Sequence, residues 1–151
     1  MLTVIPIGFV RSPRRTMDDD HWGGVRARIE LAPGVDPESL MGLEAFSHAE
    51  VIFVFDRVAE GSVARGTRHP RDNPEWPRVG IFAQRAKDRP NRIGATIVAI
   101  AGRDGAALEV TDLDAVDGTP VLDIKPVMRE FLPRTEVRQP QWATALMKDY
   151  W

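Results

Sequence analysis

The segment from Gly80 to Gly94, GIFAQRAKDRPNRIG, concentrates side chains that bind anions. It holds four cationic residues and one carboxylate between two apolar runs, Val79–Ala83 and Ile93–Ile100. Both runs are rich in β-branched residues and are predicted to be strands, so the polar segment between them is expected to form a loop. Loops on rigid sheets often carry binding residues. Residues 84–92, called here the cationic loop, are therefore the first candidate site.

The positive charge extends upstream of this loop. Residues 65–92 carry a net charge of +5 in a chain of net charge −2, so the remainder carries −7. The cations are Arg65, Arg68, Arg71, Arg78, Arg85, Lys87, Arg89 and Arg92. If this segment folds onto one face, its potential attracts anionic partners such as phosphates. The alternative is a solvated face on which these cations pair with nearby carboxylates.

Carboxylates follow two other apolar runs. Asp56 comes after Val51–Phe55, and Asp114 and Asp117 come after Ala107–Leu113. A carboxylate beside arginine stays ionised. Together with Arg85, these groups can hold a zwitterion, since carboxylates accept from amine and ribose groups while the guanidinium binds an anion. The alternative is that Asp114 and Asp117 hold turns, because Asp-Gly is a strong turn former.

Composition excludes several classes of site. The chain has no cysteine, which removes disulfides, thiolate zinc sites and a cysteine nucleophile. Its three histidines lie far apart without an HExxH pattern, so no metal site is expected. It has neither a phosphate-binding loop ending in Lys-Ser or Lys-Thr nor a dinucleotide fingerprint. No signal peptide is recognised, and no apolar run reaches the ~20 residues of a membrane helix. A cytoplasmic protein is expected.

Short apolar runs dominate the rest of the chain. Strands are predicted for Leu2–Arg11, Val25–Leu31, Val51–Phe55, Val79–Ala83, Ile93–Ile100, Ala107–Leu113 and Val121–Ile124. The continuous run Val51–Phe55 indicates a strand covered on both faces. The segment Ala59–Arg78 is expected to be a loop of roughly twenty residues, a length that is usually functional or disordered.

Helical signals are fewer. Asp36 followed by Pro37 predicts a short helix that continues to Leu43. Gln141–Tyr150 places Trp142, Ala145, Leu146 and Tyr150 at helical spacing, which predicts a closing helix docked by that face. The expected fold is mainly β: a single small β-barrel domain over residues 1–151, with a short helix after the second strand and a C-terminal helix.

Several motifs occur in the order found in one known family. They are Ile7-Gly8 with Arg11-Ser12-Pro13, Leu43-Glu44-Ala45-Phe46-Ser47-His48, Gly80-Ile81-Phe82-Ala83, Arg89-Pro90-Asn91 with Ile93-Gly94, and Asp117-Gly118-Thr119-Pro120-Val121-Leu122-Asp123-Ile124-Lys125-Pro126. On these motifs the chain resembles the TsaA-like family of tRNA methyltransferases, also called the TrmO family. The match runs from the first strand to about Pro126.

The resemblance implies a β-barrel that binds S-adenosylmethionine without a Rossmann domain. It also implies a homodimer with the cofactor close to the subunit interface. The expected acceptor is the exocyclic amine of a threonylcarbamoyl-modified adenosine beside the tRNA anticodon. Carried over by motif, the cofactor contacts are Trp22, Gly23, Asp56, Arg57, Arg85, Ala95, Asp114, Ala115, Val116 and Asp117. For Trp22 and Gly23 the match is weaker, because the family commonly has Pro-Arg-Gln followed by Gly in that segment.

Methyl transfer from a sulfonium requires the nucleophile, methyl and sulfur to be held in line. Arg89, Asn91 and Asp117 are the candidate catalytic residues: Arg89 suits phosphate, Asn91 offers a donor and an acceptor, and Asp117 can receive a proton. Asp88 and Asp114 are further proton acceptors. Asn91 is equally interpretable as a turn residue after Pro90. A target base can stack on Trp22, Trp76 or Phe82, although Phe82 is expected in the core.

The cationic loop departs from the family pattern. The usual Thr-Arg-Ser-Pro is Gln84-Arg85-Ala86-Lys87 here, Asp88 is an added carboxylate, and Arg92 replaces a frequent proline. These changes keep two alternatives open. One is a methyltransferase that acts on a small-molecule acceptor, and the other is a non-catalytic barrel that binds RNA or another ligand.

Overall fold

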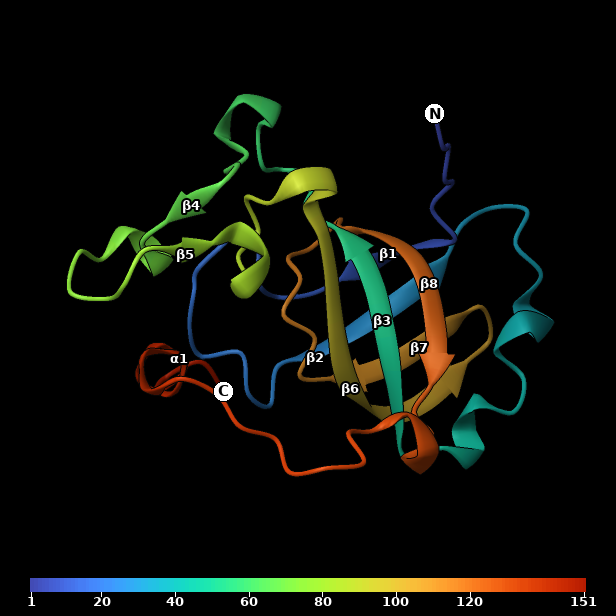
Figure 1. Ribbon diagram of the computed structural model, residues 1–151. Helices are drawn as coiled ribbons and strands as arrows, with labels where there is room; N and C mark the ends of the chain where they lie inside the picture. Colours follow the sequence, from blue (N-terminus) through green and yellow to red (C-terminus); the bar gives the residue numbers. More distant parts are fainter.

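The computed structural model describes residues 1–151 and contains a closed β-barrel (Figure 1). Neighbouring strands are antiparallel in the order β1-β2-β7-β6-β3-β8. The strands are β1 (Gly8–Arg11), β2 (Arg26–Leu31), β3 (His48–Val54), β6 (Ile93–Asp104), β7 (Ala107–Thr111) and β8 (Pro120–Pro126). The predicted β-barrel is confirmed. The first strand is shorter than predicted: it begins at Gly8, and residues 2–7 lie outside it.

The barrel interior is filled by alternate residues of each strand. In β2, Ala27 and Ile29 are buried while Arg26 and Arg28 are exposed. In β3, Val51 and Phe53 are buried, whereas Ile52 is only half-buried. The prediction that Val51–Phe55 is covered on both faces is therefore wrong. A closed barrel has one interior, so successive side chains of a strand alternate between core and outer surface.

Gly94 lets β6 pass close to the largest core side chain. It lies opposite Phe53 in the antiparallel pairing of β3 and β6. A Cβ atom at this position would lie 2.5 Å from Cε2 of Phe53, which is closer than two non-bonded carbon atoms can approach. The Ile93-Gly94 motif thus has a packing role where β6 begins.

Short 3-10 helices make most of the connections. The predicted helix from Pro37 to Leu43 is instead two of them, Pro37–Leu40 and Leu43–Ala45. Asp36 caps the first, as expected, by accepting from the Glu38 backbone N–H at 2.9 Å. The other 3-10 helices are Glu60–Ser62, Pro70–Asp72, Ile81–Ala83, Pro90–Arg92 and Arg129–Phe131.

Residues 59–92 form a lobe beside the barrel. Within it, β4 (Thr67–Arg68) and β5 (Val79–Gly80) make a separate two-stranded sheet, seen at the upper left of Figure 1. The predicted strand Val79–Ala83 is wrong, since only its first two residues are extended and they pair with β4. The 3-10 turn of Ile81–Ala83 buries Ile81 and turns the next residue outward.

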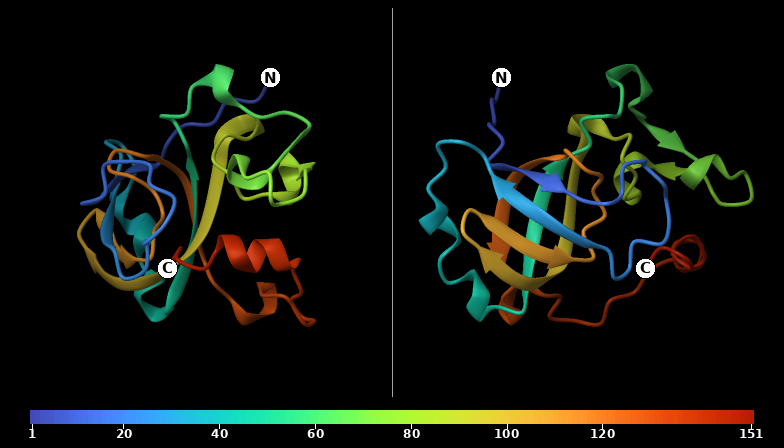
Figure 2. Two further views of the ribbon diagram at one scale, coloured as in Figure 1. Left: turned by 90° about the vertical axis from the view of Figure 1, so that its left-hand side faces the viewer. Right: turned by 180° about the vertical axis from the view of Figure 1, so that it is seen from behind.

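The chain ends beside the loop of residues 14–24, below the β4–β5 lobe (Figure 2). Residues 128–140 are exposed and lead to α1 (Gln141–Leu146), which ends four residues before the predicted Tyr150. Trp142, Leu146 and Tyr150 are half-buried as expected of a docked face, but Ala145 is exposed. None of the helices has both the length and the apolar character needed to span a membrane.

Candidate functional site

The cationic loop is fixed to the barrel through Arg85. One guanidinium nitrogen of this residue, Nη2, donates to the Ala95 carbonyl oxygen of β6 at 2.5 Å. The structure therefore brings together two residues predicted to contact the cofactor. The Arg85 side chain is exposed, and a guanidinium carries five N–H groups, so further donors are free for a bound anion.

The next residue of β6 connects this pair to Asp114. The Thr96 hydroxyl donates to Oδ1 of Asp114, and the Tyr150 hydroxyl donates to Oδ2. Burial, reinforced by the neighbouring Asp114 charge, raises the pKa of the Tyr150 phenol well above its ordinary value near 10. Arg85 and Arg71 act in the opposite direction on this pKa. Asp114 thus accepts two hydrogen bonds, and the phenol that makes one of them is influenced by two guanidinium charges.

Trp22 and Gly23 are in contact with the C-terminal residues. The Trp22 N–H donates to the Tyr150 carbonyl oxygen at 2.7 Å. A Cβ atom at Gly23 would lie 2.6 Å from the Trp151 carbonyl carbon, so the two backbones are in close contact. The Trp22 side chain is 3% exposed, and the Arg14 guanidinium lies 3.9 Å from its ring centroid. Trp22 is therefore not available to stack on a target base.

Asp117 is held by backbone groups of the segment that follows β1. Its Oδ1 accepts from the Ser12 N–H at 3.0 Å, and its own N–H donates to the Arg14 carbonyl at 2.8 Å. Arg57 donates to the carbonyl oxygens of Asp117 and Arg15 at 2.7 and 2.6 Å. These bonds support the interpretation of Asp117 as a turn anchor. Asp56, beside Arg57, is exposed.

Between the two aspartates, Ala115 and Val116 are buried, with exposed fractions of 3% and 6%. Ala115 belongs to the barrel core. Because both side chains are buried, any contact that these residues make with a ligand is expected to use their backbone groups.

Arg89 and Asn91 shape the cationic loop. Arg89 donates from Nη1 to the Gln84 carbonyl oxygen at 2.6 Å. Asn91 has φ +64° and Arg92 has φ +51°, both in the left-handed region that asparagine enters more readily than most residues. The geometry favours the turn role of Asn91 over direct contact with a substrate.

The residues that depart from the family pattern make contacts inside the lobe. Gln84 is buried, and its Nε2 donates to the carbonyl oxygens of Arg68 and Val79 at 3.2 and 3.1 Å. The added carboxylate, Asp88, forms an ion pair with Arg68 at 2.5 Å. These residues connect the cationic loop to β4 and β5.

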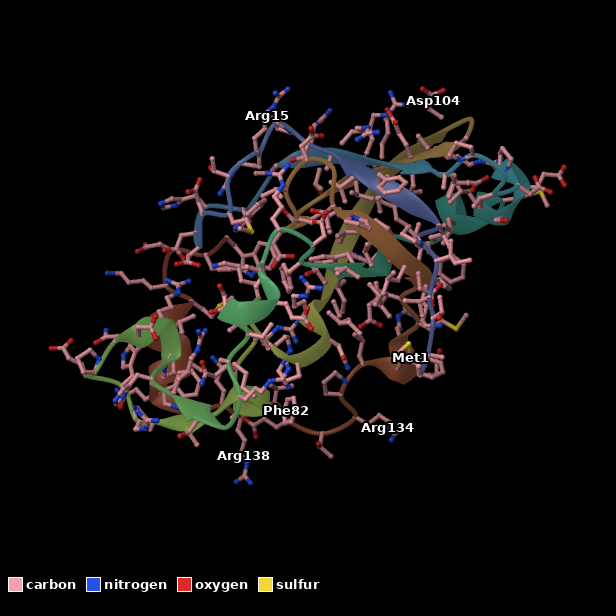
Figure 3. All side chains as sticks on the ribbon, turned by 90° about the horizontal axis from the view of Figure 1, so that it is seen from above. Met1, Arg15, Phe82, Asp104, Arg134 and Arg138 are labelled. Carbon is pink, nitrogen blue, oxygen red and sulfur yellow. The ribbon has the colours of Figure 1, made fainter.

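Phe82 is not in the core, so that prediction is wrong. It is 77% exposed because the 3-10 turn directs Ile81 inward and Phe82 outward. Figure 3 places it at the outer edge of the lobe, on the side of the molecule opposite Arg15 and Asp104. Trp76, the other candidate for stacking, is half-buried.

One chain of contacts connects six of the ten residues predicted to contact the cofactor. It runs from Arg85 and Ala95 through Thr96 to Asp114, then through Tyr150 to Trp22, Arg14, Asp117 and Arg57. Sequence reasoning missed Thr96, Arg14 and Tyr150 as members of this site. Tyr150 is the one tyrosine in the chain, and its helical spacing indicates only that it packs against the protein.

The chain is similar to known proteins in both sequence and fold. Residues 11–131 match the model of a family described as the tRNA-methyltransferase O N-terminal domain. A tRNA (adenine(37)-N6)-methyltransferase of Escherichia coli strain K12 is 40% identical over 121 residues, which cover 76% of this chain and 51% of the relative. The chain thus spans about half the length of that protein.

Two further similarities cover more of the chain. A Pyrococcus abyssi protein named "Probable S-adenosyl-L-methionine-binding protein" is 35% identical over 144 residues, covering 91% of this chain and 74% of the relative. The crystal structure of TrmO from Pseudomonas aeruginosa superposes with a TM-score of 0.73 at 32% identity, covering 91% of this chain and 61% of that one.

Proposed function

The chain belongs to the family of tRNA-methyltransferase O N-terminal domains, and on that premise we propose that it is an S-adenosylmethionine-dependent methyltransferase. The acceptor proposed is N6 of a threonylcarbamoyl-modified adenosine beside the tRNA anticodon. The observation that carries the proposal is that Arg85 and Asp114, from two separate segments, meet consecutive residues of β6: Arg85 bonds the Ala95 carbonyl oxygen, and Asp114 accepts from the Thr96 hydroxyl. A cytoplasmic location stays a prediction from the sequence.

The chemistry of this cluster fits the proposed cofactor. S-adenosylmethionine supplies an electrophilic methyl group on a sulfonium, and it carries an amine, a carboxylate and two ribose hydroxyls. The Asp114 carboxylate suits an amine or ribose hydroxyl, since it accepts only two internal hydrogen bonds and has about four lone-pair positions. The free N–H groups of Arg85 suit a carboxylate. Opposite charges within one cluster match a zwitterion.

The residues of this site are proposed to act mainly by positioning. Holding an amine nucleophile in line with a methyl group accounts for much of the rate in such a transfer and requires no covalent residue. Asp117 is a poor candidate for the proton acceptor, because Ser12 already donates to its Oδ1. Asp114 already accepts from the hydroxyls of Thr96 and Tyr150. The amine proton therefore has solvent as its simplest acceptor.

A homodimer forms part of the proposal. On β6, residues 93, 95 and 97 point to the same outer face of the barrel, since alternate residues of a strand share a face. Ile93 and Ile97 are 44% and 47% exposed, and Ala95 between them contacts Arg85. An interface between two copies on this face would bury both isoleucines and would lie next to the proposed cofactor site.

The altered cationic loop gives little support to a small-molecule acceptor. Gln84 and Asp88, which distinguish this loop from the family pattern, are engaged by Arg68 and by the Val79 backbone. Their role is to connect the loop to the β4–β5 sheet, so they imply no different acceptor.

Calorimetric titration with S-adenosylmethionine is the first test. Wild-type protein is expected to bind saturably and Arg85→Ala to bind much more weakly. Arg78→Ala is the matched control, because Arg78 is an exposed cation of the same lobe whose side chain hydrogen-bonds to Thr67. A folded wild-type protein that does not bind would overturn the methyltransferase proposal and leave a non-catalytic barrel.

Transfer of a labelled methyl group then identifies the acceptor. Label is expected in tRNA that carries the threonylcarbamoyl group and not in the same tRNA without it. Label in the small-molecule fraction of an RNase-treated extract would instead identify a metabolite methyltransferase.

Measurement of the molecular mass in solution tests the homodimer. Ile97→Glu is expected to shift the protein to a monomer.

A further inference from the structure

The last three residues of the chain contact the proposed cofactor site. The His21 and Trp22 N–H groups donate to the carbonyl oxygens of Asp149 and Tyr150 at 2.9 and 2.7 Å. The Trp151 backbone is in close contact with Gly23, and its ring packs edge-on against Tyr150 with 4.9 Å between centroids. Asp149–Trp151, called here the tail tip, thus contacts the same segment that is predicted to meet the cofactor.

The tail tip is the best-anchored part of the C-terminal segment. Residues 128–140 are all exposed, and α1 has no buried residue. In Figure 2 this segment leaves the barrel after β8 and returns to the molecule beside the loop of residues 14–24. Segments with few buried contacts open easily, so the bonds of the tail tip largely determine whether the segment stays docked.

Tyr150 makes one of the two hydrogen bonds that orient Asp114. Thr96 donates to Oδ1 from the barrel wall, and Tyr150 donates to Oδ2 from the tail tip. Two donors on different oxygens fix the plane of the carboxylate and leave about two of its lone-pair positions free.

We propose that Tyr150 is a positioning residue of the cofactor site, which holds the Asp114 carboxylate, together with Thr96, in the orientation that receives a hydrogen-bond donor of S-adenosylmethionine. This inference rests on the proposed function and adds the tail tip to the segments that line the cofactor site. Its consequence is that cofactor binding and docking of the tail stabilise each other, because both use Asp114.

The test compares Tyr150→Phe with wild-type protein. The phenyl ring keeps the packing of the tail tip and loses only the hydroxyl. The dissociation constants of S-adenosylmethionine and of S-adenosylhomocysteine are expected to rise about threefold to tenfold, the usual effect of one hydrogen bond. Thr96→Ser keeps a hydroxyl beside Asp114 and is expected to bind like the wild type, whereas Thr96→Val is expected to bind like Tyr150→Phe. Lys148→Ala, an exposed change in the same segment, is the matched control.

Because Tyr150 is the sole tyrosine, its ring gives a direct signal of tail docking. In protein labelled with [13C]tyrosine, addition of S-adenosylhomocysteine is expected to leave one sharp Cζ resonance at its docked position. A shift to the position of a free tyrosine would show that the ligand displaces the tail tip, and would overturn the inference.

The binding data separate the two proposals. Saturable binding by the wild type with equal affinity in Tyr150→Phe would overturn the role of Tyr150 and leave the methyltransferase proposal intact. Tighter binding by Tyr150→Phe would show competition between tail and cofactor and would also overturn it. Absence of binding by a folded wild-type protein would remove both proposals together.

Discussion

Asn91 belongs to a family motif, and its role in the structure is to form a backbone turn. Pro90 begins the turn, Asn91 has φ +64°, and the Arg92 N–H closes the turn on the Arg89 carbonyl at 2.9 Å. Asn91→Ala is expected to lower the free energy of unfolding by about 1 kcal/mol, because alanine enters the left-handed region less easily. Asn91→Gly should unfold like the wild type in urea. Loss of methyl transfer in folded Asn91→Gly would instead show that the amide contacts the substrate.

Tyr150 provides a second residue-scale prediction, from its pKa. Burial, then the Asp114 charge, raise the pKa of this phenol above the ordinary value near 10, while Arg85 and Arg71 oppose the shift. The native state thus favours the neutral phenol. Its contribution to stability is complete below pH 10 and declines as the pH rises from there towards the native pKa.

Ultraviolet absorbance of the phenolate measures this directly, because the chain has one tyrosine. Ionisation in the folded protein is expected at a higher pH than in urea-unfolded protein. Asp114→Asn should lower the native midpoint, since it removes the Asp114 charge and leaves burial, the largest cause. Identical midpoints for folded and unfolded protein would contradict docking of the tail tip.

At the scale of elements, Gly94 controls how closely β6 packs against β3. Gly94→Ala places a methyl group 2.5 Å from Phe53 Cε2, and overpacking of this kind costs roughly 1–3 kcal/mol of unfolding free energy. Gly80→Ala is the matched control within another family motif, because a Cβ there meets no atom within 4 Å. Urea denaturation compares the two variants. Equal stability would mean that Phe53 moves aside at little cost.

The sequence predicts elements well where the periodicity is strong. Val25–Leu31 alternates apolar and charged residues, and the structure places β2 at Arg26–Leu31. Val79–Ala83 is misassigned because a short apolar run fits a strand and a 3-10 turn equally well. The same ambiguity explains Phe82, whose side chain points outward although it lies within an apolar run.

At the scale of the whole molecule, the sequence motifs indicate which residues belong to the site. They do not indicate which of these residues contact each other in the fold. Arg85, Ala95 and Asp114 were predicted from the family resemblance, and the structure brings them together. The contact of Tyr150 with Asp114 spans 36 residues and depends on the path of an exposed segment. Local patterns carry no information about such long-range docking, so Tyr150 could be identified only from the fold.

The charge of the whole molecule sets how strongly salt should weaken the proposed binding of tRNA. Three of the eight cations in residues 65–92 form ion pairs, Arg68 with Asp88, Arg71 with Asp20, and Lys87 with Asp19. The five that form no ion pair set an upper limit on the phosphate contacts of this segment: Arg65, Arg78, Arg85, Arg89 and Arg92. The logarithm of the association constant for an anticodon stem-loop should therefore fall with that of salt concentration with a slope no steeper than about −3.5. The affinity for S-adenosylmethionine, which is not a polyanion, should change little over the same range.

The ion pair between Arg71 and Asp20 provides the control for this salt dependence. Asp20→Asn frees Arg71 and is expected to steepen the slope by about 0.7, the effect of one further phosphate contact with single-stranded RNA. The same change at Asp123, whose carboxylate pairs with Lys125 on β8, is expected to leave the slope unaltered. A slope near zero for the wild type would exclude the lobe as an RNA-binding surface. A slope much steeper than about −3.5 would mean that the ion pairs open on RNA or that a second copy of the chain contributes cations.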